Sequence, residues 1–290
     1  MKRVLVIQKT SLYGQLLSSP KAPDAERVFN KDGALQERYA NAHADNENTM
    51  NLVHGALRRA GLEFEACARP DIPKTKDFDL VVTVGGDGTF LDASHAVTDI
   101  PVLGVNSSIT SSIGHFCCSH VGNFEEILQD VLSGKKKPIL RYRMQVELNG
   151  TPLPILALNE VLFTHQIPAG TTRYRIKVGN KEEAHKSSGV WISTFSGSTG
   201  AIMSAGGTKE PQPAKSLQYL VREPYVRGEQ HFDLLQGYSE EPIEIYSTSG
   251  HGALFIDGPG ERLDLEFGSK VVFRPGYAPL QAFIADSDNQ

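Results

Sequence analysis

Apolar and polar residues follow the pattern of an alternating α/β domain along the first half of the chain. Short runs of β-branched residues and leucine predict four strands, at residues 3–8, 62–68, 79–84 and 101–105. Apolar residues recur at helical spacing in residues 49–60 and again after Gly122, which predicts helices between and after these strands. Residues 11–36 are mostly polar and contain two prolines, so they predict a long loop or lid. We therefore predict a Rossmann-like α/β domain with a mostly parallel sheet at residues 1–137.

The second half of the chain has the period of β structure. Residues 139–148 alternate between apolar and polar, and Asn149 followed by Gly150 is a strong signal for a β-hairpin. Further strand patterns follow at residues 174–178, 189–194, 243–247, 253–257 and 271–273. We therefore predict a β-rich, sandwich-like domain at residues 138–290, whose C-terminal tail packs back on the first domain.

One stretch of the first half is unusually rich in glycine. The apolar strand at residues 79–84 ends at a turn made of Gly85, Gly86, Asp87, Gly88 and Thr89. Glycine lets backbone N–H groups approach a ligand closely, and a turn between a strand and a helix start points those groups and the helix dipole at one place. This pattern predicts an anion site, with Thr89 as the cap of the following helix.

Asp87 is the unexpected residue in an anion site. A carboxylate repels phosphate unless it holds a metal ion or takes a proton from an attacking hydroxyl, so its position predicts a catalytic role. The simpler alternative is a tight turn capped by Asp87. The chain contains neither the Gly-x-x-x-x-Gly-Lys-Ser/Thr loop of P-loop NTPases nor a Gly-x-Gly-x-x-Gly dinucleotide fingerprint.

Composition excludes several classes of function. The net charge of −5 argues against a nucleic-acid or anionic-membrane surface, and no apolar segment approaches the ~20 residues that span a bilayer. The three cysteines include the adjacent pair Cys117 and Cys118, so they indicate no disulfide framework. The chain also opens directly on a strand pattern, so we expect no signal or transit peptide. We expect a cytoplasmic protein that binds neither nucleic acid nor membrane.

Three further clusters of polar residues interrupt the apolar pattern. Asn106 follows the strand at residues 101–105, and Gly114 and His115 lie shortly after it. Asn159 and Glu160 stand inside an apolar run, where a charge is costly unless it is paired or hydrogen-bonded. A strand then leads into a turn rich in hydroxyl groups and glycine at residues 195–200, a second geometry suited to anions. The first two clusters have structural alternatives, namely an ordinary serine-rich loop and a polar network at a sheet rim. The third is no nucleophile elbow of a serine hydrolase, because Ser196 stands where Gly-x-Ser-x-Gly requires glycine.

The order of these motifs resembles the NAD kinase family over nearly the whole chain. The Gly-Gly-Asp-Gly-Thr string alone is similar to a kinase superfamily that also contains diacylglycerol kinases, sphingosine kinases and 6-phosphofructokinases. Asn159 and Glu160, then Ser188 and Gly189, then residues 197–207 complete the NAD kinase series. In detail, Val4 to Thr10, residues 187–189 and residues 221–224 resemble the branch of plant NADH kinases and mitochondrial NAD kinases.

This resemblance implies an enzyme that uses ATP and Mg²⁺, or another divalent cation, to phosphorylate the adenosine 2′-hydroxyl of NADH or NAD⁺. It implies that Asp87 is the base or the metal organiser at that hydroxyl. It also implies a set of residues around the donor phosphates or the dinucleotide: Gly85, Gly86, Gly88, Thr89, Asn106, Gly114, His115, Asn159, Glu160, Ser188, Thr199, Gly200, Ala201, Ser204 and Arg222. It implies no dedicated protein metal site. The expected assembly is a homodimer, with a tetramer as the alternative.

Two positions depart from the commonest members of the family. Those enzymes carry an acid where this chain has Ser188 and a tyrosine where it has Ala201, and both departures resemble the NADH-preferring branch. Two other functions stay open on the residues alone. One is a lipid or sugar kinase of the same superfamily, and the other is a dinucleotide-binding sensor without catalysis. Asp87 favours an enzyme, because a sensor has no use for a carboxylate beside phosphate.

Overall fold

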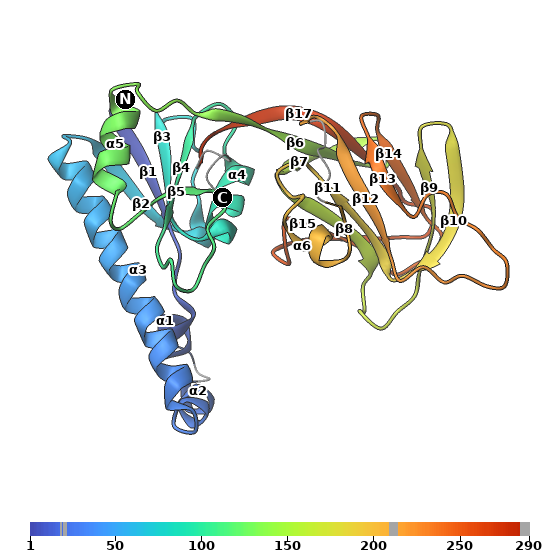
Figure 1. Ribbon diagram of the computed structural model, residues 1–290, viewed down its shortest axis with the longest axis horizontal. Coiled ribbons are helices and arrows are strands. Elements are labelled where there is room, and N and C mark those ends of the chain that lie inside the picture. Colours follow the sequence, from blue (N-terminus) through green and yellow to red (C-terminus); the bar gives the residue numbers. More distant parts are fainter. Residues whose placement is uncertain (18, 20–21, 209–213, 285–290) are drawn as a thin grey trace. The chain divides into compact units, whose positions relative to one another are not determined.

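The structure is a computed structural model that describes residues 1–17, 19, 22–208 and 214–284. The chain divides into two compact units (Figure 1). Unit 1 contains Met1–Leu140 and the chain from Leu280 onward, and unit 2 contains Arg141–Pro279. The fold class predicted from the sequence, an α/β domain followed by a β-rich domain, is confirmed.

Unit 1 is built on a parallel sheet. Its strands are β1 (Arg3–Gln8), β2 (Glu63–Ala68), β3 (Leu80–Gly85), β4 (Val102–Asn106) and β5 (Cys117–His120). They lie in the order β2–β1–β3–β4, and β5 pairs with β4. Strand β17 (Lys270–Phe283) begins in unit 2 and ends in unit 1, where Ala282 and Phe283 pair in parallel with β4. All of these pairings are parallel, so the carboxyl ends of the strands share one edge of the sheet.

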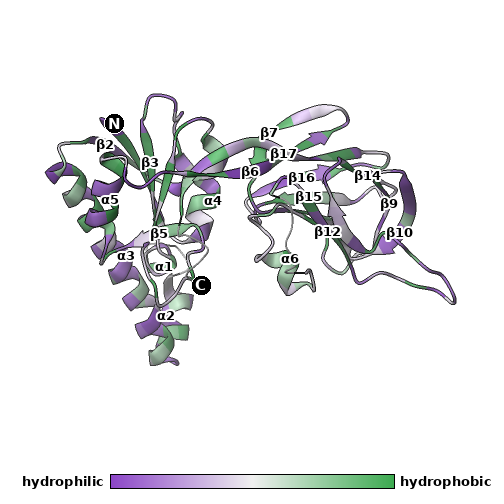
Figure 2. Cartoon of the chain, turned by 45° about the horizontal axis from the view of Figure 1, so that its top comes forward, coloured by the Kyte–Doolittle hydropathy of each residue, from purple (hydrophilic) through white to green (hydrophobic). Residues whose placement is uncertain are grey.

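Helices cover both faces of this sheet. Helices α3 (Gly33–Arg59) and α5 (Phe124–Leu132) pack residues such as Leu57 and Phe124 against Val4 and Val82 in one apolar cluster. Leu5 and Val81 are buried outside that cluster, because alternate residues of a strand face opposite sides. Helix α4 (Asp87–Ala96) contacts β1, β3 and β4 and covers this second face. The hydropathy follows this layering: β3 is almost entirely hydrophobic, whereas α3 has one hydrophobic and one hydrophilic side (Figure 2).

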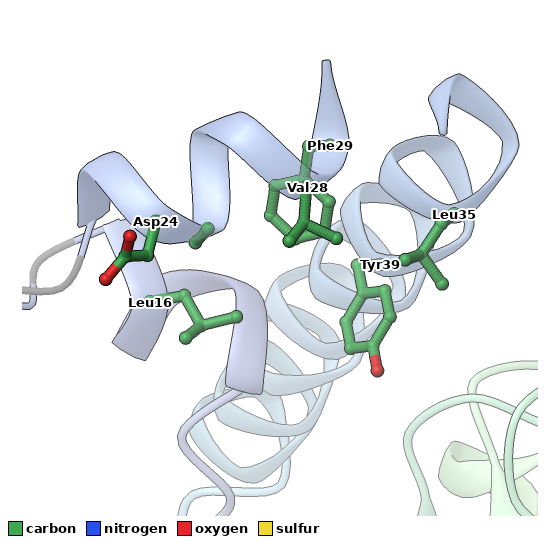
Figure 3. A pocket seen from close by; sticks show the side chains of 7 residues that line it. Leu16, Asp24, Val28, Phe29, Leu35 and Tyr39 are labelled. Carbon is green, nitrogen blue, oxygen red and sulfur yellow. The ribbon is translucent and has the colours of Figure 1, made fainter. Parts of the chain in front are cut away.

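The prediction of a loop or lid at residues 11–36 is wrong for the described residues of this segment. They form helices α1 (Leu12–Leu17) and α2 (Ala22–Phe29) and the start of α3, which begins at Gly33 rather than near residue 49. The few apolar side chains of this polar segment pack on α3 and form a small pocket of about 330 Å³ between the three helices (Figure 3). The Phe29 ring lies 5.7 Å from the ring of Tyr13 and 5.8 Å from that of Tyr39. Tertiary packing of a few apolar residues thus stabilises helices α1 and α2, which the polar composition of this segment did not predict.

Unit 2 is a sandwich of antiparallel strands. One sheet continues from β17 through β14 (Ile243–Ser247) and β9 (Thr172–Val178) to β10 (Lys181–Ser187), with β6 (Ile139–Leu148) and β7 (Thr151–Ala157) on the other side of β17. The second sheet has the order β13 (Gln236–Ser239), β12 (Leu217–Arg222), β11 (Gly189–Ser193), β8 (Glu160–His165), β15 (Gly252–Ile256) and β16 (Glu261–Leu265). Inward-facing residues of both sheets, such as Ile245 and Phe163, form one core. The hairpin predicted at Asn149 and Gly150 joins β6 to β7, and both residues have positive φ. Among the described helices, none is both long and apolar enough to cross a membrane.

Candidate active site

The glycine turn of unit 1 leaves no room for side chains at two positions. A Cβ atom built on Gly85 would lie 2.2 Å from the Thr89 hydroxyl oxygen, and one built on Gly86 would lie 2.4 Å from the Ser112 hydroxyl oxygen. Both distances are far below van der Waals contact. A side chain at Gly85 would displace the buried Thr89, and one at Gly86 would require the Ser112 hydroxyl to move, so the backbone of the turn is packed closely against its neighbours.

Helix α4 begins directly at this turn with Asp87, and Gly86 is its N-cap. The prediction that Thr89 caps the helix is wrong, because Thr89 already lies in the first helical turn and its buried hydroxyl faces Gly85. The N–H groups of Thr89 and Phe90 bond to the Gly86 carbonyl oxygen at 3.0 and 3.3 Å. The N–H groups of Asp87 and Gly88 belong to the first turn, where no carbonyl oxygen of the helix can accept them. No side chain caps this end, so these two groups are available to an anion.

Asp87 is half-buried and fixed by one hydrogen bond. Its Oδ1 accepts a hydrogen bond of 2.8 Å from the backbone N–H of Phe116, whose ring stacks on Phe90 with centroids 5.1 Å apart. Burial raises the pKa of the neighbouring Cys117 thiol well above its usual range, and the charge of Asp87 raises it further. The thiol beside Asp87 is therefore neutral.

Asn106 holds the segment that runs beside the glycine turn. It ends β4 and is buried, its Nδ2 donates to the Ser112 carbonyl oxygen at 3.0 Å, and its Oδ1 accepts from the Ser108 N–H at 3.2 Å. Gly114 has a φ of +70°, and a Cβ atom on it would lie 2.5 Å from the Asn106 Nδ2. Both features require glycine at this position. His115 is exposed at the end of the segment.

In unit 2 the structure brings Asn159 and Glu160 against the second glycine turn. Thr194 donates its backbone N–H to the Asn159 carbonyl oxygen at 2.8 Å. A Cβ atom on Gly197 would lie 2.3 Å from that same carbonyl oxygen, and one on Gly200 would lie 2.8 Å from the Glu160 Oε2. Thr199, Ala201 and Ser204 follow from the same turn, where helix α6 (Ala201–Ser204) begins. The sequence predicted these two groups of residues separately, and the structure places them in contact.

Asp257 is a residue of this cluster that was absent from the predicted set. Its carboxylate accepts the backbone N–H groups of Leu158, Asn159 and Glu160 at 2.7, 2.8 and 3.0 Å. Asp257 has a φ of +49° and is followed by Gly258 with a φ of +120°, so the backbone is strained where it presents this carboxylate. An aspartate directly before a glycine at the end of an apolar strand was the available sequence signal.

Two polar atoms of the unit 2 cluster are buried without a hydrogen-bond partner in the described residues. They are the Asn159 Oδ1 and the Glu160 Oε2. Burial, and secondly the charge of Asp257, raise the pKa of Glu160 to about 7, although the N–H of Ala201 donates to its carboxylate and acts in the opposite direction. Buried polar atoms normally have partners, so these two mark a place for a ligand with hydroxyl or amide groups.

Ser188 and Arg222 lie at the other end of the same sheet. The register pairs Gly189 with Arg222, whereas Glu160 pairs with Ser193 at the opposite end of β11. Gly189 and Ser193, the two ends of β11, are therefore roughly 13 Å apart, at ~3.3 Å per strand residue. Ser188 donates its N–H to the Arg222 carbonyl oxygen at 3.0 Å, and the Arg222 guanidinium lies 5.9 Å from the Trp191 ring centre. Within one chain the structure therefore separates these two predicted residues from the Glu160 cluster.

Among the described residues, no three His, Cys, Asp or Glu side chains come together as a metal site. Magnesium is usually held by one or two carboxylates together with substrate phosphates. Asp87, beside two open helix N–H groups, fits a magnesium ion that arrives with a phosphorylated substrate.

A parallel sheet whose ligand edge carries a glycine turn at a helix N-terminus defines a phosphate-binding α/β protein, here joined to a β-sandwich. The model of the ATP-NAD kinase N-terminal domain matches residues 25–135. A probable NADH kinase of Oryza sativa subsp. japonica is 37% identical over 237 residues, which are 73% of this chain and 73% of that protein. The NADH kinase of Arabidopsis thaliana is 32% identical over 269 residues, 84% of this chain and 85% of that protein.

The fold agrees with these sequence relatives. An NAD kinase from Archaeoglobus fulgidus, solved in complex with ATP, superposes with a TM-score of 0.66 at 20% identity and covers 98% of this chain and 94% of its own. The chain belongs to the NAD kinase family and is a kinase.

The raised pKa of Glu160 predicts how stability depends on pH. In the unfolded chain this carboxyl ionises near its ordinary value of 4.5, and in the folded protein near 7. The folded state therefore binds more protons between these values, and its stability falls as the pH rises from about 4.5 to 7. The glutamine of Glu160→Gln cannot ionise, so this variant should unfold at a higher urea concentration than the wild type at pH 8. Relative to the wild type, its free energy of unfolding should be higher at pH 8 than at pH 5 by at most ~3 kcal/mol.

The measurement is the free energy of unfolding from urea titrations at pH 5 and pH 8. Glu261→Gln, which changes an exposed glutamate of the same unit, is the matched control and should leave the pH dependence unchanged. An equal effect of Glu160→Gln at both pH values would contradict the assigned ionisation.

Proposed function

We propose that this protein transfers the terminal phosphate of ATP to the adenosine 2′-hydroxyl of NADH and NAD⁺, and so makes NADPH and NADP⁺. The observation that carries the proposal is Asp87, a carboxylate at the start of a helix whose N–H groups suit phosphate. The relatives named NADH kinase and the NAD kinase solved with ATP support the choice of both substrates.

The donor phosphates lie against the turn of unit 1. Gly86, Gly88 and Thr89 surround the phosphates, which accept the open N–H groups of Asp87 and Gly88, and Gly85 keeps the turn close to its neighbours. Asn106, Gly114 and His115 belong to the segment that Asn106 holds beside this turn. The hydrogen bond from Phe116 orients Asp87 so that its second oxygen can accept the proton of the ribose hydroxyl.

Asp87 need not be a strong base for this reaction. Phosphoryl transfer passes through a loose transition state, so positioning and charge neutralisation contribute most and the proton leaves late. Mg²⁺ bound with ATP would neutralise the phosphate oxygens. As the alternative to acting as the base, Asp87 would be the side chain that holds this ion. The protein's own contribution is to align the hydroxyl and the phosphate.

The dinucleotide lies against the cluster of unit 2. The Asn159 Oδ1 accepts a hydrogen bond from a ribose hydroxyl, and the Glu160 Oε2 accepts one when the carboxyl group is ionised; both atoms have no partner in the described residues. Thr199, Gly200, Ala201 and Ser204 line the same place. Ser188 and Arg222 contact a more distant part of a bound dinucleotide. The homodimer, the tetramer as its alternative and the cytoplasmic compartment stay predictions from the sequence.

We expect NADH to be used at least as well as NAD⁺. This expectation rests on the resemblance to the NADH-using branch: where the commonest NAD kinases have an acid and a tyrosine, this chain has Ser188 and Ala201. Ala201 has no aromatic ring that could stack on a ring of the dinucleotide. Such stacking contributes roughly 0.5–1.5 kcal/mol, or up to about tenfold in affinity. Initial rates with ATP and Mg²⁺ should therefore give a kcat/KM for NADH equal to or above that for NAD⁺, and a tenfold preference for NAD⁺ would contradict this.

Asp87→Asn tests the catalytic role. Asparagine keeps an oxygen that can accept the Phe116 N–H, so the fold and the binding of dinucleotide should be nearly unchanged. The charge is lost, so kcat should fall by ~10²–10⁴-fold. Asp130→Asn, which removes an exposed ion pair with Lys135 elsewhere in unit 1, is the control and should keep the wild-type kcat. A kcat of Asp87→Asn close to that of the wild type would reduce Asp87 to a turn residue.

A further inference from the structure

A second cavity of unit 1 lies beside the glycine turn. It has a volume of about 300 Å³ and is lined by Lys9, Thr10, Gln15, Arg69 and Asp92. These residues come from segments that are far apart in the sequence: the end of β1, helix α1, the short 3₁₀ helix η1 (Arg69–Asp71) and helix α4. The volume is at the small end of the range for ligand pockets, ~300–1,000 Å³, so it suits a chain of phosphates better than a whole nucleotide.

Lys9 connects this cavity to the first glycine of the turn. Its backbone is fixed on both sides, because its N–H donates to the Val84 carbonyl oxygen at 2.9 Å and its carbonyl oxygen accepts from the Asn46 Nδ2 at 3.1 Å. A Cβ atom built on Gly85 would lie 3.2 Å from the Lys9 Cβ. The exposed ammonium group makes no ion pair with any described residue. With a fixed backbone and an ammonium group that makes no ion pair with a described residue, Lys9 is suited to bind an anion.

Arg69 connects the cavity to the last glycine of the turn. Its Nε donates to the Asp92 Oδ2 in an ion pair, and its Nη1 would lie 3.5 Å from a Cβ atom built on Gly88. Asp92 thus occupies one side of the guanidinium and leaves the two Nη groups for another acceptor. Arginine has five N–H donors in a planar fork that matches phosphate oxygens.

The ion pair with Asp92 does not by itself account for this arrangement. Both partners are partly exposed, with 41% and 34% of their side chains accessible, and such pairs contribute little to stability. Asp92 neutralises one of the two cations, so the cavity keeps one net positive charge from Lys9. The open N–H groups of Asp87 and Gly88 lie at the start of the same helix that carries Asp92.

We propose that Lys9 and Arg69 hold the phosphates of the donor nucleotide, with Asp92 as the positioning residue for Arg69. This inference rests on the proposed function and extends it to two residues outside the set of site residues that the resemblance implies. Lys9 contacts the phosphates beside Gly85, and the Arg69 fork contacts them beside Gly88. The unit 2 cluster around Glu160 takes no part in holding the donor.

The test combines steady-state kinetics with ATP-binding calorimetry on the full chain. Arg69→Leu and Lys9→Met remove each charge and keep most of the side-chain volume, and Arg69→Lys keeps the charge without the fork. Arg59→Leu is the matched control, because Arg59 also forms a partly exposed ion pair in unit 1, with Glu125, and lines no part of the cavity. Thermal unfolding midpoints show whether each variant folds.

Arg69→Leu and Lys9→Met should raise the KM and Kd for ATP by about 10- to 100-fold, as the loss of a hydrogen-bonded charge does. The KM for NADH should stay within about twofold, Arg69→Lys should lie between Arg69→Leu and the wild type, and Arg59→Leu should match the wild type. An unchanged Kd for ATP, or an equal rise in the KM for NADH, would overturn the inference.

Different results contradict the proposed function and the role of Lys9 and Arg69. If the wild type binds ATP but phosphorylates neither NADH nor NAD⁺, the proposed function is wrong, and calorimetry of the variants still decides the role of Lys9 and Arg69. If the wild type binds no ATP in the presence of Mg²⁺, both the inference and the proposed function are contradicted.

Discussion

The close packing of the Thr89 hydroxyl and the Lys9 stem on Gly85 is the constraint on which the candidate site of unit 1 depends. With 2.2 Å between a Cβ atom at Gly85 and the Thr89 oxygen, the turn exists only because glycine has no side chain. This packing fixes where helix α4 begins and therefore where its open N–H groups point. Asp87 follows by one residue, and the hydrogen bond from Phe116 fixes its orientation. In the proposed function, one backbone geometry thus provides both the N–H groups for a phosphate and the carboxylate next to them.

Unit 2 depends on a different kind of constraint, the burial of charge. Asp257 satisfies three backbone N–H groups and so holds the turn that carries Asn159 and Glu160. The same carboxylate lies close enough to Glu160 to raise its pKa in addition to the effect of burial. Ionisation of Glu160 is therefore unfavourable in the folded protein, and the cluster contains two buried polar atoms without a partner in the described residues. Such a cost is usual where a ligand supplies the missing hydrogen bonds.

Local patterns in the sequence predicted most of the fold and missed what depends on distant contacts. Periodicity identified β1 to β4 in unit 1 and β6, β9, β11, β14 and β15 in unit 2, and it missed strands such as β8 and β12. The Gly-Gly-Asp-Gly-Thr string located the glycine turn, because this signal too is carried by neighbouring residues. Helices α1 and α2 were missed because only a few apolar residues in a polar segment pack on α3. The start of helix α4 depends on the room around Gly86 rather than on Thr89, so the predicted cap was wrong. Arg69 could not be recognised, since its place beside Gly88 arises from folding alone.

The central claim is that a phosphate held at the glycine turn is transferred to the adenosine 2′-hydroxyl of NAD(H). The position of the new phosphate tests it most directly, by phosphorus NMR of the dinucleotide formed from ATP, Mg²⁺ and NADH with the wild-type protein. The account predicts a single new monoester signal, assigned to the adenosine 2′-oxygen, in amounts equal to the ADP released. Release of ADP without a phosphorylated dinucleotide, or a phosphate on another oxygen, would contradict it.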